Sequence, residues 1–228
     1  MDGSAIQACW QGKIPVIFQL ENKSDKKCSK LLLLVSRISY FPILLDKIIN
    51  HFNDDFTKNN MDTENIWLKS GDCPIRWQYP IGVIFDIHSF QTTKKCYPWV
   101  IDICCKNVPP QILRIGKIEA MKIFFISSLK QSDNIRHNSS VISSLLKNEV
   151  NQLWNNLKDE SLKNYWEINK KLMNPENYRN VPFRIYVVQE FKPLIVLQKR
   201  VSSKSDTDGK LISLLDLLNI FFENSNQI

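Results

Sequence analysis

The segment Ile14-Pro-Val-Ile-Phe-Gln-Leu20 decides the fold, because it is the first of two short apolar runs that predict a β-hairpin. The second run is Leu31–Ser36, and the polar, lysine-rich residues between the two predict a loose loop. Apolar side chains then recur at helical spacing over Tyr40–Phe56. A hairpin followed directly by a helix indicates a small unit that mixes strands and helices.

The next sixty residues complete this unit. Ile66–Lys69 and Ile75–Trp77 bracket Gly71-Asp72, a turn signal that predicts a second hairpin. Pro80–Phe90 begins with proline and predicts a helix, and Pro98–Cys105 predicts a buried strand. The order strand, strand, helix, strand pair, helix, strand is typical of a ubiquitin-like β-grasp, although other α+β folds could also produce it.

The spacing of apolar residues changes after Val108-Pro109-Pro110, and this proline-rich segment predicts a domain boundary. Apolar stripes predict three helices, over Lys117–Asp133, Ser140–Lys158 and Ser161–Met173, with Ser139 and Ser140 as candidate N-caps of the second. The middle third of the chain is therefore predicted to be a compact helical region.

The last part of the chain repeats the hairpin-then-helix order. Phe183–Gln189 and Leu194–Leu197 predict strands joined by a turn at 190–193, Asp208-Gly209 predicts another turn, and Leu211–Phe222 predicts a helix. Only 47 residues remain from Pro182 onward, whereas a complete small core needs roughly 70. We therefore expect an N-terminal segment (1–12), a first ubiquitin-like domain (13–107), a helix-rich region (113–178) and an incomplete second ubiquitin-like domain (181–228).

Composition agrees with a globular protein, since 43% of the 228 residues are hydrophobic and 23% are charged. The net charge is +7, and residues 111–180 contribute +4 of it through 11 basic and 7 acidic side chains. The six cysteines form no CxxC and match no zinc spacing, so no metal or cofactor is predicted. Met1–Gln11 lacks the apolar core of a signal peptide. We expect a cytoplasmic chain with reduced thiols.

Short motifs spread over residues 8–218 resemble the autophagy protein 5 family in their order and spacing. Those of the first half are Trp10-Gln-Gly-Lys-Ile-Pro15, Arg37-Ile-Ser-Tyr40, Ile66-Trp67, Trp77-Gln-Tyr-Pro-Ile-Gly82, Phe85-Asp86 and Pro98-Trp99. Those of the second half are Leu129-Lys-Gln-Ser-Asp133, Val141-Ile142, Gln152-Leu-Trp154, Trp166-Glu-Ile-Asn-Lys-Lys-Leu-Met173 and Pro182-Phe-Arg-Ile-Tyr186.

This resemblance implies two ubiquitin-like domains flanking a helix-rich region. It also implies a non-catalytic subunit of a conjugation-promoting complex. Family members are joined covalently, through one lysine, to the C-terminal glycine of the ubiquitin-like autophagy protein 12, with the help of the autophagy conjugating enzymes. They bind a helix of autophagy protein 16 in a groove. The complex promotes attachment of autophagy protein 8 to phosphatidylethanolamine at the preautophagosomal membrane, where weak peripheral contact is expected.

The resemblance places the acceptor at Lys130, in the motif Leu129-Lys-Gln-Ser-Asp133. The family commonly has an acidic residue after this lysine, and here the residue is Gln131. From the residues alone, Lys130 is better explained as one of many surface lysines, favoured by the dipole near a helix C-terminus, and only the family motif singles it out. Lys122 is a second possible acceptor that no motif supports.

Candidate partner and membrane contacts come from the same motifs, and each has a simpler explanation. Trp10, Ile14, Trp77 and Tyr79 are candidates for contact with the partner helix, although we favour core positions for them. Lys170 and Lys171 are candidates for membrane contact, although we favour ordinary solubilising lysines.

Three alternatives remain open. A hydrolase could use Cys104 or Cys105 with a histidine, but the cysteines lie in a strand that is predicted to be buried, and His88 is predicted on an apolar helix face. A nucleic-acid binder would fit the basic charge, but the chain lacks a recognition motif and a basic stripe. A scaffold of the same family could bind autophagy protein 12 without a covalent bond.

Overall fold

The computed structural model describes residues 3–21, 29–91, 97–138, 140–174, 179–187, 195–205 and 209–222. The chain divides into two compact units. The first unit comprises Met1–Phe125 and Trp154–Lys163, and the second comprises Ile126–Leu153 and Asn164–Ile228.

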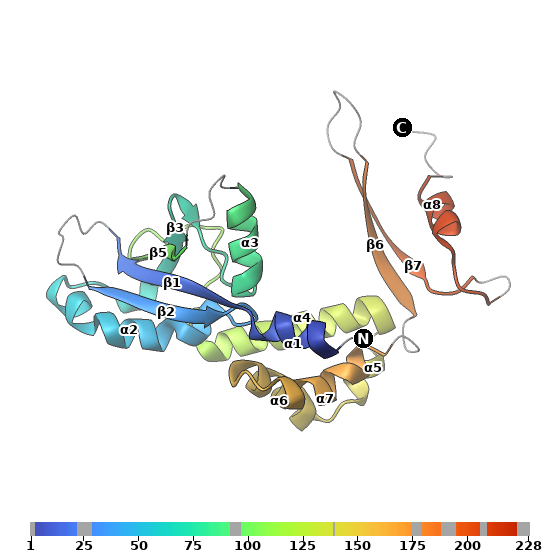
Figure 1. Cartoon of the computed structure of the whole chain (residues 1–228), viewed down its shortest axis with the longest axis horizontal. Helices are drawn as coiled ribbons and strands as arrows, with labels where there is room; N and C mark the ends of the chain where they lie inside the picture. Colours follow the sequence, from blue (N-terminus) through green and yellow to red (C-terminus); the bar gives the residue numbers. More distant parts are fainter. Residues whose placement is uncertain are drawn as a thin grey trace. The chain divides into compact units, whose positions relative to one another are not determined.

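The first unit is built on a five-stranded sheet (Figure 1). Its elements are α1 (Gly3–Gln11), β1 (Lys13–Leu20), β2 (Lys30–Ser36), α2 (Phe41–Lys58), η1 (Thr63–Asn65), β3 (Trp67–Ser70), β4 (Cys73–Pro74), α3 (Ile81–Gln91) and β5 (Trp99–Cys104). The strand order is β2-β1-β5-β3-β4, and β1 and β5 run parallel while the other neighbours are antiparallel. The predicted β-grasp order is confirmed.

Alternation along β1 explains why the sheet has one buried face. Every second side chain from Ile14 to Leu20 is buried, and the core side of α2 supplies Phe41, Leu45, Ile48, Phe52 and Phe56. Trp99 of β5 donates its indole N–H to the Ser70 hydroxyl at 2.8 Å, so the polar atom of this buried ring is satisfied.

The start of α3 is tied to the end of β2 through backbone hydrogen bonds. The N–H groups of Ile81 and Gly82 donate to the carbonyls of Ser39 and Arg37, both at 2.8 Å. A Cβ atom at Gly82 would lie 2.9 Å from the Arg37 carbonyl oxygen, so only glycine fits this close approach. Two of the sequence motifs are thus joined at one contact.

Two predictions in the first sheet need correction. The second strand of the small hairpin is Cys73–Pro74 rather than Ile75–Trp77. Ile75 still donates its N–H to Leu68, but Trp77 is buried and donates its indole N–H to the Leu113 carbonyl, which draws the chain away from the ladder. The N-terminal segment also contains a helix, α1, that the sequence pattern did not predict.

The helical region contains four helices among the described residues: α4 (Ile118–His137), α5 (Ser140–Ser144), α6 (Lys147–Lys158) and α7 (Leu162–Leu172). The predicted single helix over 140–158 is wrong, because it is broken after Ser144. Ser144 donates its hydroxyl to the Val141 carbonyl, which competes with helix continuation, and Glu149 accepts the Leu146 N–H and so caps a new helix. The candidate cap Ser139 lies outside the described residues.

The C-terminal part of the second unit has β6 (Asn180–Val187) paired antiparallel with β7 (Ile195–Ser202), followed by α8 (Leu214–Phe222). Its buried core consists of Val201, Leu217 and Phe221. The helix was predicted from Leu211 but begins at Leu214, because Ser213 and Asp216 form reciprocal capping hydrogen bonds. The predicted turn at 190–193 and Asp208 lie outside the described residues.

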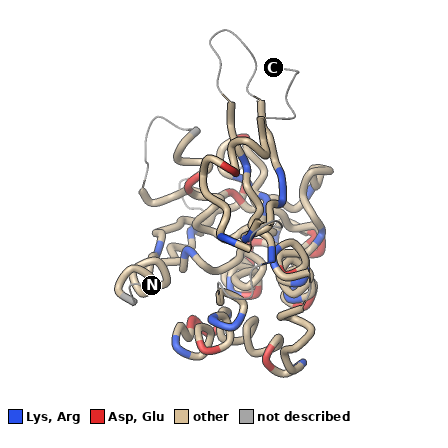
Figure 2. Tube along the Cα trace, turned by 90° about the vertical axis from the view of Figure 1, so that its right-hand side faces the viewer, with Lys and Arg blue, Asp and Glu red and all other residues tan. Residues whose placement is uncertain are grey.

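The predicted α+β class is confirmed: a β-grasp sheet, a helix-rich middle and a C-terminal sheet are all present. None of the described helices is long and apolar enough to cross a membrane. Lys and Arg residues lie interspersed with Asp and Glu residues along the traced backbone in the view of Figure 2.

Candidate functional site

Lys130 projects from α4 and is exposed to solvent. The helix was predicted to end at Asp133, but it continues to His137, about two turns beyond Lys130. The helix dipole acts mainly on the last turn. It therefore does not explain a lysine at this position, and the interpretation of Lys130 as a C-terminal dipole partner loses its support.

A buried network fixes the helix close to Lys130. Asp133 is 3% exposed, and its Oδ1 lies 2.7 Å from Nδ1 of His137, one turn further along α4. Its Oδ2 accepts the Ile142 N–H at 3.0 Å and so ties α4 to α5. The aspartate of the Leu129-Lys-Gln-Ser-Asp133 motif is therefore a structural residue that fixes α5 beside the Lys130 turn.

A cavity of about 540 Å³ opens next to Lys130 and lies within the second unit. We call it the Lys130 cavity. Its lining is contributed by α4, α5, the α5–α6 junction and α6, and consists of Ile126, Lys130, Ile142, Ser143, Leu145, Lys147, Val150 and Asn151. Four of these lining residues are apolar and two are lysines, and no carboxylate occurs among them.

The break between α5 and α6 shapes this cavity. Leu145 and Lys147 line it, whereas Leu146 between them is 71% exposed. Glu149 secures the start of α6 by accepting the Leu146 N–H and pairs with Lys171 of α7 at 2.6 Å. The hydrogen bond from Lys171, together with that from Leu146, lowers the pKa of the Glu149 carboxyl.

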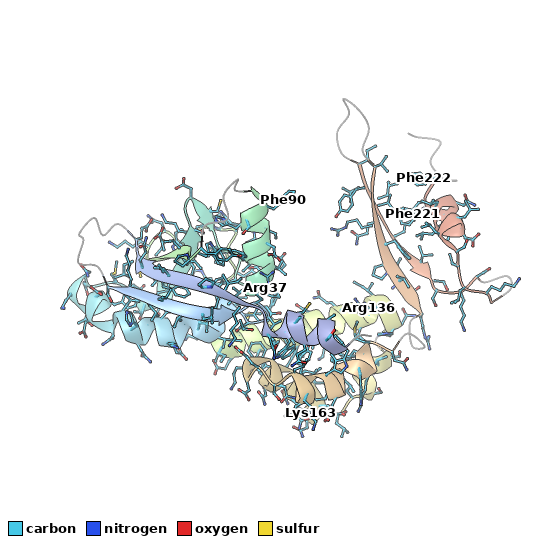
Figure 3. The ribbon with its side chains drawn as sticks, viewed as in Figure 1. Arg37, Phe90, Arg136, Lys163, Phe221 and Phe222 are labelled. Atoms are coloured by element: carbon cyan, nitrogen blue, oxygen red, sulfur yellow. The ribbon has the colours of Figure 1, made fainter. Side chains whose placement is uncertain are left out.

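The end of α4 is held by contacts to two later segments of the second unit. Arg136, labelled in Figure 3, donates to the Met173 sulfur at 3.6 Å, and its carbonyl accepts the Arg179 N–H at 3.0 Å. Together with the Asp133 network, these contacts make the helix turns that follow Lys130 a rigid base.

The four candidate partner-helix residues fall into two groups. Ile14 and Trp77 are 1% and 2% exposed in the core of the first unit, so their side chains are not accessible to a partner. Tyr79 is exposed, and Trp10 is half-buried with its indole N–H donated to the Glu160 carbonyl. Only Tyr79 and Trp10 present surface that a partner could contact.

The two candidate membrane residues are both exposed on the last turn of α7. Lys171 is engaged by Glu149, which leaves Lys170 as the simpler candidate. Lys122, the second possible acceptor, is half-buried on α4.

Cys104, the last residue of β5, and Cys105, which follows it, lack the properties of a nucleophile. Burial is the main cause that raises the pKa of the Cys104 thiol, and it raises that of Cys105 to about 11. His88 lies against Trp99 and the Ser70 hydroxyl. Thiols held in the neutral form are poor nucleophiles, so this geometry disfavours the hydrolase alternative. Among the described residues, no cluster of three or more His, Cys, Asp or Glu side chains could hold a metal ion.

The sequence motif singled out Lys130, but the cavity beside it was missed. The predicted continuous helix over 140–158 would have placed Leu146 on a buried stripe and left no break. The available signal was the pair Ser143-Ser144 followed by Glu149, since serines favour local backbone hydrogen bonds and a glutamate suits a first helical turn.

Two family models match this chain. The model described as "Autophagy protein ATG5, UblA domain" matches residues 9–105, and "Autophagy protein ATG5, alpha-helical bundle region" matches residues 118–175. The second match contains Lys130 and the whole lining of its cavity.

Curated relatives agree with the models. Autophagy protein 5 of Drosophila melanogaster is 30% identical over 224 residues, covering 95% of this chain and 81% of that protein. Autophagy-related protein 5 of Caenorhabditis elegans is 23% identical over 221 residues, covering 93% and 79%. The crystal structure of Kluyveromyces marxianus Atg5 aligns with a TM-score of 0.68 at 19% identity, over 86% of this chain and 77% of that one, and so supports the fold.

Proposed function

This chain belongs to the autophagy protein 5 family, and we propose on that premise that Lys130 accepts autophagy protein 12 through an isopeptide bond. Family membership supports a role in autophagy. The observation that carries the proposal is an exposed amine, Lys130, in the family motif on a rigid helix beside an open cavity.

In this reaction the acceptor chain has only to present an exposed amine. At neutral pH nearly all lysine amines are protonated, so the conjugating enzyme has to remove a proton before the amine attacks the thioester. The acceptor contributes exposure and position, and the Asp133 network supports both by fixing the helix. We therefore propose a non-catalytic role for this chain.

We further propose the family's downstream steps. The conjugate binds a helix of autophagy protein 16, with Trp10 and Tyr79 as the accessible candidate contacts on this chain. The assembly promotes lipidation of autophagy protein 8 with phosphatidylethanolamine. It acts in the cytoplasm and at the preautophagosomal membrane, where Lys170 offers weak electrostatic contact.

The direct test is Lys130→Arg, assayed by reconstituted conjugation of the full chain with autophagy protein 12 and its activating and conjugating enzymes. Arginine keeps the charge but offers no acylable amine. The expected result is complete loss of the large gel shift, with Lys122→Arg indistinguishable from wild type. A conjugate that persists on Lys130→Arg would refute the assignment. Gln131→Glu, which restores the family's acidic residue, measures how far the departure weakens recognition.

A further inference from the structure

The strand β2 forms one edge of the sheet in the first unit (Figure 1). The strand order ends at β2, so no strand among the described residues pairs with its outer side. The ladder between β1 and β2 runs through seven consecutive pairs without a bulge. β2 therefore presents a regular edge, and it lacks the bulge that turns many natural edges away from other chains.

The hydrogen bonding of the ladder shows which backbone groups of β2 face outward. The Arg37 N–H donates to the Gly12 carbonyl at 2.9 Å, so this pair is hydrogen-bonded. Hydrogen-bonded and non-hydrogen-bonded pairs alternate along an antiparallel ladder. The N–H and C=O groups of Leu32 and Leu34 therefore point away from β1, towards the open edge.

The side chains of β2 are apolar on both faces of the strand. Leu32 and Leu34 are each 65% exposed, on the face that points away from the core. Leu31 and Leu33 are half-buried against the core, and so is Leu44 of α2. An unbroken apolar run is typical of a strand that is covered on both faces. The composition of β2 therefore favours an occupant that brings apolar side chains to this edge.

The charge beside the edge is positive. Lys30, the first residue of β2, is exposed. Lys47 and His51 share one face of α2, and Nε2 of His51 lies 3.1 Å from the hydroxyl of Ser29, which directly precedes β2. Lys47 therefore lies on the β2 side of α2, whereas Asp46 lines a cavity that α2 forms with η1 and the start of α4. The two lysines favour an occupant with acidic side chains.

We propose that the edge of β2 binds an extended, acidic segment of another protein, which adds a strand to the five-stranded sheet. The backbone of this segment exchanges hydrogen bonds with Leu32 and Leu34, its apolar side chains lie beside the leucines, and its acidic side chains face the two lysines. A second copy of this chain is a poorer occupant, because pairing two β2 edges would bring the lysines of both copies together. The proposal is independent of conjugation at Lys130.

The test is a titration of the full chain with a short synthetic peptide that has alternating valine and isoleucine residues between acidic ends. We expect saturable binding and slower hydrogen exchange of the Leu32 and Leu34 amides, whereas the Leu33 amide, which already bonds to β1, should change little. A matched peptide with lysine ends should bind roughly tenfold more weakly. No saturable binding up to about 1 mM peptide would overturn the proposal, and equal binding of the two peptides would overturn its acidic component.

Two variants of the chain separate strand addition from simple contact with an apolar surface. Leu32→Pro removes an N–H that faces outward, so it breaks no bond to β1, and it should weaken binding roughly tenfold. Lys47→Glu should weaken binding roughly threefold or more. The control Lys117→Glu, at an exposed lysine that lines the cavity on the other side of α2, should bind as wild type does.

A further check leaves the protein unchanged and so does not depend on the folding of a variant. Two peptides, methylated on alternate sets of backbone nitrogens, should differ, because only one set pairs with β2. One peptide should lose binding and the other should keep it. Equal binding of both, or unchanged binding to Leu32→Pro, would refute strand addition. Dimers of the chain alone that Leu32→Pro abolishes would identify a second copy, rather than an acidic segment, as the occupant.

Discussion

The two hairpin-then-helix segments of this chain follow the same order but differ sharply in burial. In the first, β1 buries Ile14, Val16, Phe18 and Leu20, and α2 buries six side chains. In the second, every described side chain of β6 is at least partly exposed, and α8 buries only Leu217 and Phe221. The local patterns are alike, yet only the first segment has a closed core.

The difference lies in what pairs with the first strand. β1 has β2 on one edge and β5, in parallel, on the other, and β5 brings Trp99, Ile101 and Ile103 into the core. Among the described residues β6 pairs with β7 alone, and Leu214 and Leu215 of α8 remain largely exposed. Figure 3 shows Phe221 and Phe222 on this helix. A hairpin and a helix therefore do not make a core until distant strands join them.

The largest expected effect comes from a matched pair of phenylalanine truncations, which test the difference in burial between the two hairpins. Phe18→Ala on β1 should lower the free energy of unfolding of the first unit by about 3–5 kcal/mol, because Phe18 is fully buried. Phe183→Ala on β6 should lower that of the second unit by less than about 2 kcal/mol, because Phe183 is only half-buried.

Native-state hydrogen exchange of the β1 and β6 amides measures the two losses separately. Leu32→Ala, at an exposed position of β2, is the surface control and should change neither. Equal losses for the two phenylalanines would mean that the second hairpin is as well packed as the first.

A smaller effect on stability tests which side chains hold α8 against the hairpin. Leu217→Ala should destabilise the helix against the hairpin by about 2 kcal/mol, the low end for a buried leucine, because its core is small. Leu215→Ala, two residues earlier and 67% exposed, should have almost no effect. Exchange rates of the α8 amides report both. A large effect of Leu215→Ala would show that the exposed face of α8 is covered in solution.

The fold was predictable wherever apolar side chains recur at a regular spacing within one element. The alternation of β1 and the helical spacing of α2 depend on side chains that are near in sequence, and both were placed correctly. The position of β4 was missed because Trp77 is drawn to the Leu113 carbonyl, a partner 36 residues away. The break between α5 and α6 was missed because it depends on side-chain capping by Ser144 and Glu149 rather than on hydrophobic period.

Of the candidate site, only the residue Lys130 could be predicted from the sequence, and the cavity beside it could not. The family motif identified Lys130, and its side chain is exposed in the structure. The cavity beside it depends on where α5 stops and how α6 starts, and on Asp133 reaching Ile142, nine residues later. Sequence spacing on one helix says nothing about these contacts between helices, so the surface that surrounds the amine required the structure.

The smallest expected effect is a difference between the two hairpins in how their stability depends on pH. Glu21, which follows β1, pairs with Lys69 of β3, and hydrogen bonding to Lys69 is the main cause that lowers the pKa of Glu21. The second hairpin instead has a bond from Arg184 to the uncharged Gln198, which does not titrate in acid. Since the Glu21 pKa is depressed in the folded state, the ion pair stabilises the fold above the unfolded pKa, near 4, and this stabilisation is lost as the pH falls through the lower folded value.

Glu21→Gln should therefore lower the stability of the first sheet by roughly 0.2–1 kcal/mol at pH 7, typical of a partly exposed pair. The difference between wild type and variant should be smaller in acid than at pH 7 if thermal unfolding is followed at both values. Arg184→Gln serves as the control on the second hairpin, because its effect should be the same at both pH values, and a Glu21→Gln difference that persisted in acid would show that packing rather than charge joins β1 to β3.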